Sequence, residues 1–217
     1  MGRFPVSGIA YHPYTPPAGP HTPEGTDDAA IGQLARLRAT IDALARHGKL
    51  PGRLPIWITE FGYQTKPPDP LQGARLKKAA AFMDESEWIA FRNPRVASYS
   101  QYTLYDDPPR SGPGALHWSS WQAGIYFRNG KRKPSVFNAF RLPVHLRTLS
   151  GGRVEVFGGR RIPGETATVQ VKAPGASYRT LGTVAVNSAG YFRRSFKVGN
   201  ASRGKLKVTI DGVSRVK

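Results

Sequence analysis

Residues 54–63 read Leu54-Pro55-Ile56-Trp57-Ile58-Thr59-Glu60-Phe61-Gly62-Tyr63. The segment is almost continuously apolar up to Ile58, which is typical of a strand buried on both faces of a parallel sheet. Ligands bind beyond the carboxyl ends of parallel strands, so Glu60 is expected to point into a site, and Gly62 lets the next loop turn away. The alternative is a structural carboxylate that pairs with one of the chain's many arginines.

Helical and strand-like patterns alternate on both sides of this segment. Helices are expected over residues 29–47, 71–91 and 134–140, and strands over residues 4–11 and 96–105. Asp27 and Asp28 are the expected N-cap of the first helix, and Gly48 is its expected stop. The order predicts an α/β fold whose crossovers allow parallel pairing. Three such units form either an open, doubly wound sheet or the last part of a (β/α)8 barrel, the TIM barrel.

The sequence changes character from Arg153 onward. Short alternating runs separated by Gly and Pro turns cover residues 154–157, 166–171, 181–186, 191–198 and 206–210. This spacing predicts a small antiparallel β-sandwich with an immunoglobulin-like arrangement. We therefore expect two domains, residues 1–143 and residues 144–217.

Basic residues concentrate in the second of these domains. The chain has 32 Lys and Arg against 14 Asp and Glu, and from Val144 onward the counts are 14 and 3, which gives that part +11 of the net charge of +18. Such a surface attracts nucleic acid, anionic polysaccharide or a membrane surface, or is simply solvated. No nucleic-acid recognition motif accompanies the charge, so we expect no specific nucleic-acid partner and consider an anionic polysaccharide instead.

The composition also excludes several kinds of site. The chain has no cysteine, so it has neither disulfides nor thiolate metal sites, and its five histidines are isolated, which gives no metal-ligand spacing. No run approaches the roughly 20 apolar residues that a membrane span needs. The first strand-to-helix turn has no Gly-x-Gly-x-x-Gly, and neither a phosphate-binding loop nor a Ser-His-Asp pattern is visible.

Two residues that follow the first predicted strand are candidates for the same site as Glu60. His12 and Tyr14 are two positions apart on an extended chain, so both side chains face one side and reach toward Glu60 if the two strands are neighbours. The alternative is that this proline-rich loop packs its rings against the rest of the protein.

Further aromatic residues follow the third predicted strand. Tyr102 stands at its end, and Trp118 and Trp121 lie in the next loop, which also contains Asp106 and Asp107. Exposed aromatic rings beside carboxylates are typical of sugar binding, because a ring stacks on the apolar face of a pyranose whose hydroxyls need acceptors. Alternatively the rings are core and the two aspartates accept hydrogen bonds within the loop.

Three of these motifs resemble clan A glycoside hydrolases, the group that includes cellulase-like family 5 and xylosidase-like family 39. Residues 57–63 resemble the seventh-strand motif, in which the glutamate is the nucleophile. His12-Pro13-Tyr14 is similar to a His-x-Tyr after the sixth strand, whose tyrosine contacts that nucleophile. The last segment of the family's barrel is similar to two stretches of this chain, Trp121-Gln122-Ala123-Gly124 and Lys133-Pro134-Ser135. The resemblance covers residues 4–143.

The resemblance implies that residues 1–143 are the last three βα units of a TIM barrel in a retaining glycosidase. Glu60 would be the nucleophile, and substrate-binding residues would be His12, Tyr14, Tyr102, Trp118 and Trp121. The substrate would be a poly- or oligosaccharide, no cofactor would be needed, and the protein would be secreted or at the cell surface. The chain opens directly on a strand, so we expect it to be part of a longer protein.

The general acid/base of this clan follows an asparagine at the end of the fourth strand. The chain contains no Asn-Glu pair, and Glu24, Asp69 and Asp106 lie on segments that do not match. The expected strand-eight tryptophan is replaced by Gln101 and Tyr102. We therefore expect this polypeptide alone to have little or no hydrolase activity. The alternative function is a noncatalytic carbohydrate-binding or cell-wall-associated protein.

Overall fold

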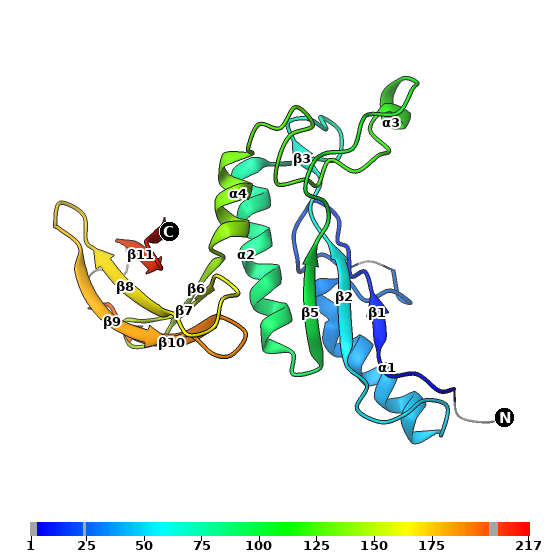
Figure 1. Cartoon of the computed structure of the whole chain (residues 1–217), viewed down its shortest axis with the longest axis horizontal. Helices are drawn as coiled ribbons and strands as arrows, with labels where there is room; N and C mark the ends of the chain where they lie inside the picture. The colour runs from blue at the N-terminus through cyan, green and yellow to red at the C-terminus, as the bar shows by residue number, and fades with distance from the viewer. Residues whose placement is uncertain (1–3, 24, 200–203) are drawn as a thin grey trace. The chain divides into compact units, whose positions relative to one another are not determined.

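The chain is a mixed α/β protein with several sheets. A computed structural model describes residues 4–23, 25–199 and 204–217, and it divides into two compact units, Met1–Phe137 (unit 1) and Asn138–Lys217 (unit 2) (Figure 1). The domain assignment 1–143 and 144–217 stays a prediction. Among the described residues, no helix has the length and apolar character that crossing a membrane requires.

The elements of unit 1 follow the predicted alternation. They are β1 (Ile9–Tyr11), η1 (Ile31–Gln33), α1 (Leu34–Arg46), β2 (Ile56–Phe61), β3 (Thr65–Lys66), β4 (Ala74–Arg75), α2 (Leu76–Arg92), β5 (Val96–Gln101) and α3 (Gly114–His117). The next helix, α4 (Pro134–Arg141), is the predicted third helix with one more residue.

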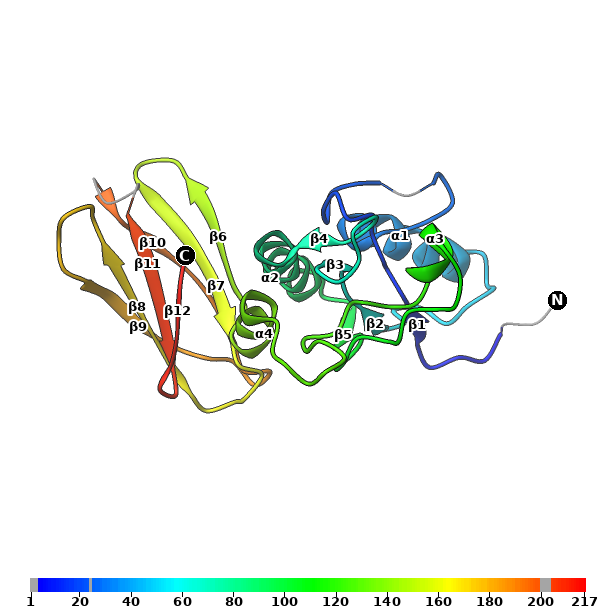
Figure 2. The same cartoon turned by 90° about the horizontal axis from the view of Figure 1, so that it is seen from above.

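The main sheet of unit 1 has the strand order β1-β2-β5 and is parallel throughout. Figure 2 shows the crossover helices α1 and α2 on the same face of this sheet. Ile56 and Ile58 are fully buried, whereas Trp57, which points to the other face, is 47% exposed. The prediction that this strand is buried on both faces is therefore wrong, because both helices cover the same face.

The first helix begins differently from the prediction. A short 3-10 turn, η1, precedes α1, and the amide of Ala30 donates to the side-chain oxygen of Gln33 at 3.2 Å. The amide of Ala29 donates to the hydroxyl oxygen of Tyr11 at 3.0 Å. Asp27 and Asp28 are therefore not the N-cap, because a tyrosine from β1 and the glutamine satisfy these amides. The predicted stop is confirmed: Gly48 has a left-handed φ of 68° just after α1.

Three other predicted elements are shorter in the structure. Strand β1 covers only the end of the predicted 4–11, and β5 ends at Gln101 rather than at 105. Helix α2 begins at Leu76 rather than at 71, because Ala74 and Arg75 pair with Thr65 and Lys66 in the small parallel sheet β3-β4.

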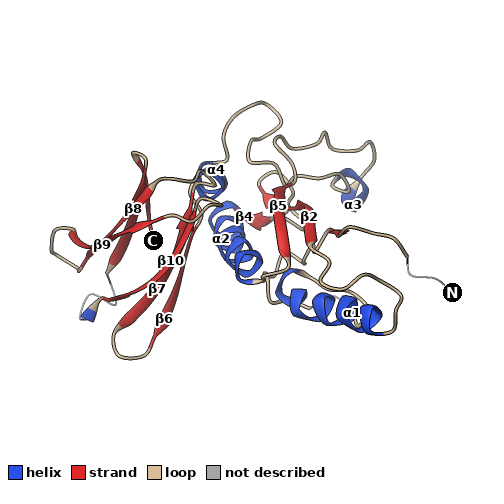
Figure 3. Ribbon diagram, turned by 60° about the horizontal axis from the view of Figure 1, so that its bottom comes forward, coloured by secondary structure: helices blue, strands red, loops and turns tan. Residues whose placement is uncertain are grey.

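Unit 2 consists of two antiparallel sheets (Figure 3). Its strands are β6 (Val144–Leu149), β7 (Arg153–Gly159), β8 (Thr166–Lys172), β9 (Arg179–Ala185), β10 (Tyr191–Lys197), β11 (Lys205–Ile210) and β12 (Val213–Val216). The sheets have the orders β10-β7-β6 and β12-β11-β8-β9, and they share one apolar core that includes Val156, Val169, Phe192 and Val208. The five predicted strands are confirmed as antiparallel strands, whereas β6 and β12 were missed. The immunoglobulin-like arrangement stays a prediction.

Candidate functional site

Glu60 lies at the carboxyl end of β2, where two side chains contact one of its carboxylate oxygens. The hydroxyl of Tyr14 donates a hydrogen bond of 3.0 Å to Oε2, and Nδ1 of His12 lies 3.4 Å from the same atom. The other ring nitrogen of His12 lies 2.9 Å from the hydroxyl oxygen of Thr59. The Glu60 side chain is 35% exposed, and no described residue bonds to Oε1. The carboxylate is thus oriented through one oxygen and open at the other.

The parallel pairing of β1 with β2 explains why these residues meet. Tyr11 is in register with Ile58, so the residues that follow each of them emerge at the same edge of the sheet. The loop after β1 is held in place because the amide of Tyr14 donates to the carbonyl of His12 and the amide of Ile31 donates to that of Pro13. The structure therefore brings together the His12, Tyr14 and Glu60 that the sequence singled out.

The end of β5 approaches this group closely. A Cβ on residue 62 would collide with the carbonyl oxygen of Tyr102, so only glycine fits at Gly62. The side-chain amide of Gln101 donates to the carbonyls of Tyr102 and Ala123, at 2.8 and 2.9 Å. These contacts place the segment after β5 and the loop around residue 123 beside the end of β2.

Aromatic rings form a wall next to Glu60. Trp121 stacks on Tyr14 with a centroid distance of 4.8 Å and an interplanar angle of 22°. Tyr102 meets Trp121 edge-on at 5.7 Å, and Tyr14 also lies parallel to Phe61 at 6.2 Å. The predicted residues Tyr102 and Trp121 therefore pack against the tyrosine that binds the carboxylate.

The two tyrosines near Glu60 are held in their neutral form. Burial, followed by the hydrogen bond to Glu60 and the charge of that carboxylate, raises the pKa of Tyr14 far above its ordinary value. Burial also raises the pKa of Tyr102, with smaller contributions from the charges of Glu60 and Asp107. Tyr14 therefore keeps its hydroxyl proton at neutral and moderately alkaline pH and can donate it to Oε2 of Glu60.

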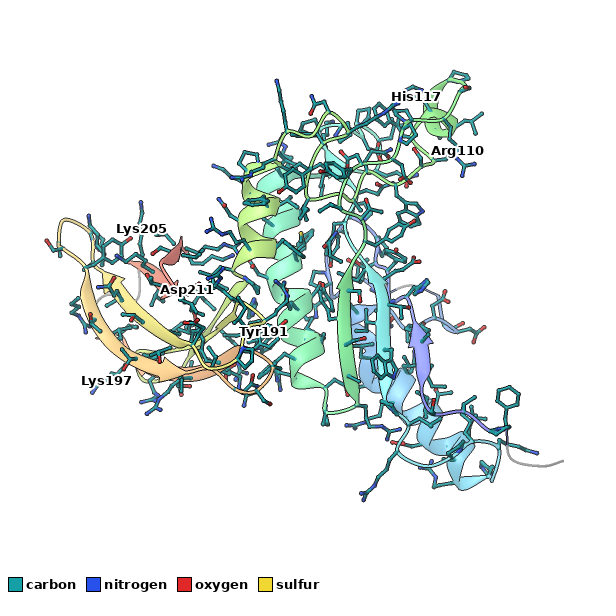
Figure 4. All side chains as sticks on the ribbon, viewed as in Figure 1. Arg110, His117, Tyr191, Lys197, Lys205 and Asp211 are labelled. Carbon is teal, nitrogen blue, oxygen red and sulfur yellow. The ribbon has the colours of Figure 1, made fainter. Side chains whose placement is uncertain are left out.

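A cleft of about 380 Å³ opens beside the aromatic wall. Its lining includes Tyr14, Trp118 and Trp121, together with glutamines Gln64 and Gln72. Trp118 stands edge-on to His117, which Figure 4 labels together with Arg110 on the loop that contains α3. The volume is within the range of small-molecule sites, and aromatic rings beside amide groups can contact both the apolar face and the hydroxyls of a sugar.

The two aspartates of the neighbouring loop do not point at a ligand in this cleft. Asp106 is buried and binds the ammonium group of Lys133 at 2.6 Å and the amide of Gly124 at 3.0 Å. Asp107 accepts the amide of Trp121 at 3.3 Å. The interpretation of Asp106 as a sugar-hydroxyl acceptor beside the aromatic rings is therefore wrong because it is buried, and the alternative of loop acceptors describes both residues.

The chain has detectable similarity to solved structures alone. No protein-family model matches the sequence, and no curated protein matches it. The matching structures described here are glycoside hydrolases.

The first is an FMN-binding β-glucuronidase from Facaelibacterium prausnitzii L2-6, with 14% identity, a TM-score of 0.41, and coverage of 97% of this chain and 31% of that one. A β-glucuronidase from Ruminococcus gnavus, in complex with D-glucuronic acid, has 13% identity, a TM-score of 0.36, and coverage of 60% and 22%. A β-D-mannosidase from Dictyoglomus thermophilum has 11% identity, a TM-score of 0.42, and coverage of 65% and 18%. The chain thus spans less than a third of each of these structures.

Among the described residues, neither Asp69 nor Asp106 supplies a second carboxyl to Glu60. Asp69 is buried and accepts the amides of Leu71 and Gln72 at 2.8 and 3.1 Å. The carboxylate of Asp106 accepts a hydrogen bond from the ammonium group of Lys133. Glu24 lies outside the described residues. Among the described residues, no cluster of three or more His, Asp or Glu side chains could hold a metal ion.

Sequence reasoning missed the buried polar residues that hold the Trp121 loop. Lys133 is fully buried and donates to Asp106, to the hydroxyl of Thr65 and to the carbonyl of Gln122. Gln64 donates to the carbonyl of Ser120 and accepts the amide of Gln122. Burial raises the pKa of Asp106 and lowers that of Lys133, and their mutual attraction opposes both changes. The sequence did point to Lys133, because Lys133-Pro134 is part of the motif that resembles the last segment of the family's barrel. That motif does not indicate that the lysine is buried.

Proposed function

We propose that unit 1 is part of a retaining glycoside hydrolase acting on a poly- or oligosaccharide, with Glu60 as the nucleophile. The observation that carries the proposal is the contact of Oε2 with both Tyr14 and His12, while no described residue bonds to Oε1 and Tyr14 itself lines the aromatic cleft. A purely structural carboxylate would be expected to pair with an arginine or lysine, and no described Lys or Arg forms an ion pair with Glu60. We further propose that the protein acts outside the cell or at its surface.

The fold part of the proposal is a partial TIM barrel followed by an immunoglobulin-like accessory domain. Consecutive strands lie side by side in the order β1-β2-β5, and their crossover helices cover one face. A doubly wound sheet places helices on both faces, whereas a barrel wall has helices on its outer face only. The exposed face that carries Trp57 would then be turned toward the barrel interior.

The chemistry follows from the orientation of the carboxylate. Oε1 of Glu60 attacks the anomeric carbon, the bond from that carbon to the leaving oxygen breaks, and its electron pair stays on the leaving oxygen. Water later attacks the same carbon and releases Glu60 as a carboxylate. Tyr14 and His12 hold Oε2 and so aim Oε1. A second carboxyl about 5 to 5.5 Å away must first give a proton to the leaving oxygen and then activate the water, and we propose that this chain lacks it.

Activated substrates test this proposal because a nitrophenolate leaving group departs without a general acid. We expect the purified chain, incubated with a panel of nitrophenyl glycosides, to form a stable sugar adduct detected by intact-mass spectrometry and mapped to Glu60. Water cannot discharge the adduct quickly without a general base, so turnover should stay very low. The variant Glu60→Gln should form none. Absence of an adduct across the panel, or sustained turnover that survives Glu60→Gln, would refute the assignment.

A noncatalytic carbohydrate-binding or cell-wall-associated protein is the second candidate. The observation that favours it is that no carboxylate is among the described residues that line the aromatic cleft, since aromatic rings and amide groups can bind a sugar without one. Saturable binding of oligosaccharides that depends on Trp118 and Trp121, with no adduct on Glu60, would select this function over the first.

A further inference from the structure

The outer face of the sheet β12-β11-β8-β9 in unit 2 carries a group of lysines around one tyrosine. The apolar residues of β8 and β11 alternate into the core, which leaves Gln170 and Lys172 of β8 and Lys205 and Lys207 of β11 on the other side. The three lysines, Gln170 and Tyr178 are called the lysine face below. Figure 4 labels Lys205 at the start of β11.

The strand register places these positive charges next to one another. Lys205 lies directly opposite Lys172, and Lys207 lies opposite Gln170, one pleat further along the same face. Like charges at directly opposed positions of an antiparallel pair are destabilising. Within residues 4–23, 25–199 and 204–217, no carboxylate forms an ion pair with any of the three lysines. Asp211, which follows β11, binds Arg160.

Tyr178 supplies an aromatic surface between the lysines. The Nζ atom of Lys207 lies 4.6 Å from the centroid of its ring, and that of Lys172 lies 5.8 Å from it. This cation–π contact partly offsets the repulsion between the ammonium groups. Polar groups continue the face toward β9, where the side-chain amide of Gln170 donates to the hydroxyl of Thr180 at 3.4 Å.

We propose that the lysine face binds an anionic polysaccharide. The ammonium groups would pair with its carboxylate or sulfate groups, the ring of Tyr178 would contact the apolar face of a sugar, and the amide of Gln170 would bind hydroxyls. Bound anions would remove the repulsion between Lys172 and Lys205. This inference goes beyond the function proposed for Glu60 and does not depend on it, because it concerns binding by unit 2.

A polysaccharide fits this face better than a nucleic acid does. Proteins that bind single-stranded nucleic acid offer successive aromatic rings on which neighbouring bases stack. The lysine face has one ring, that of Tyr178, so it offers no succession of rings for neighbouring bases. The lysines also lie on the two central strands of a four-stranded sheet, rather than on a protruding helix or two-stranded ribbon that could enter a duplex groove.

Affinity measurements on the full chain test the proposal, with polygalacturonate as the probe and neutral dextran and single-stranded DNA as comparison ligands. The variant Lys172→Gln/Lys205→Gln/Lys207→Gln should bind polygalacturonate at least about tenfold more weakly and depend less steeply on salt, since fewer counterions are released. Tyr178→Ala should also weaken binding while leaving the salt dependence unchanged, because it removes stacking and no charge.

The matched control removes three exposed positive charges from the other sheet, in the variant Arg153→Gln/Arg194→Gln/Lys197→Gln. It should keep affinity within about threefold of the unmodified chain, because only the general attraction of unit 2 is reduced. Equal losses in the two triple variants would show diffuse attraction and overturn the proposal. So would the absence of binding to polygalacturonate, or tighter binding of DNA that depends on the same lysines.

Thermal unfolding of the same proteins shows whether each variant is folded. Without ligand, the lysine-face variant should melt at a slightly higher temperature than the unmodified chain, because the repulsion between Lys172 and Lys205 is gone. Polygalacturonate should raise the melting temperature of the unmodified chain and leave that of this variant almost unchanged.

Discussion

The charged side chains near Glu60 have hydrogen-bond or ion-pair partners, whereas the ammonium groups of the lysine face have no carboxylate partner among the described residues. Around Glu60, polar groups have assigned partners: Tyr14 and His12 bind the carboxylate, and Lys133 neutralises the buried Asp106 in the loop that carries Trp121. On the lysine face, Lys205 lies opposite Lys172, and the ammonium groups of Lys172 and Lys207 both lie over the ring of Tyr178. The first arrangement keeps a reactive group in one position, and the second leaves charges available to a ligand. Four predictions test this difference.

The largest effect is expected from breaking the buried ion pair. Lys133→Met leaves the carboxylate of Asp106 buried without a cation, which should lower the free energy of unfolding by about 3–5 kcal/mol. Lys131→Met, two positions away and exposed, should change it by less than about 0.5 kcal/mol. Urea unfolding measures both. The double variant Lys133→Met/Asp106→Leu should recover part of the loss, and a double variant no more stable than the single one would contradict the role of the pair.

A smaller effect is expected from the hydroxyl that holds Glu60. Tyr14→Phe keeps the ring stacked on Trp121 but removes the donor to Oε2, so adduct formation with a nitrophenyl glycoside should slow by about 10- to 100-fold. Tyr126→Phe removes a hydroxyl elsewhere in unit 1 and should leave the rate unchanged. Time-resolved intact-mass spectrometry gives the rates. Equal rates for Tyr14→Phe and the unmodified chain would show that the hydroxyl of Tyr14 does not contribute to adduct formation at Glu60.

Alkaline pH should weaken unit 1 through Tyr63. Burial raises the pKa of Tyr63, which bonds to Ser86, to about 12. The raised pKa means that the contribution to stability is complete below the unfolded value of about 10 and is lost as pH rises toward 12, by an amount on the order of 2 kcal/mol. Urea unfolding between pH 8 and 11 should show this decline, and Tyr63→Phe should make it less steep, with Tyr14 and Tyr102, whose pKa values are also raised, causing the remainder. An unchanged slope in Tyr63→Phe would assign the decline to other groups.

The smallest effect is expected on the lysine face itself. Lys205→Glu replaces the like-charge pair opposite Lys172 by an opposite-charge pair, which should stabilise unit 2 by about 0.2–1 kcal/mol. Arg194→Glu, at an exposed position opposite the uncharged Val156 in the other sheet, serves as the charge-matched control. Melting temperatures at low salt compare the two variants. A gain that is equal in both would reflect reduced net charge rather than the pairing in the register.

Much of the fold could be predicted from local patterns of apolar and turn-forming residues. The alternation of helices and strands in unit 1, the stop at Gly48 and five strands of unit 2 could be predicted because spacing and turn residues reflect nearby backbone geometry. Strands β6 and β12 were missed, since β6 lies directly after the expected domain boundary and β12 has only four residues. The N-cap prediction failed because a distant residue, Tyr11, satisfies the amide of Ala29.

The sequence alone determined which residues stand at strand ends, because apolar runs followed by polar residues and glycine mark those positions in any parallel sheet. Thus Glu60, His12 and Tyr14 could be named as one group before their distances were known. Only the tertiary structure decided that Trp57 is exposed, that Asp106 is buried with Lys133, and that Lys172 lies opposite Lys205. Those outcomes depend on which face the helices cover and on strand register, and both are set by contacts between residues far apart in the chain.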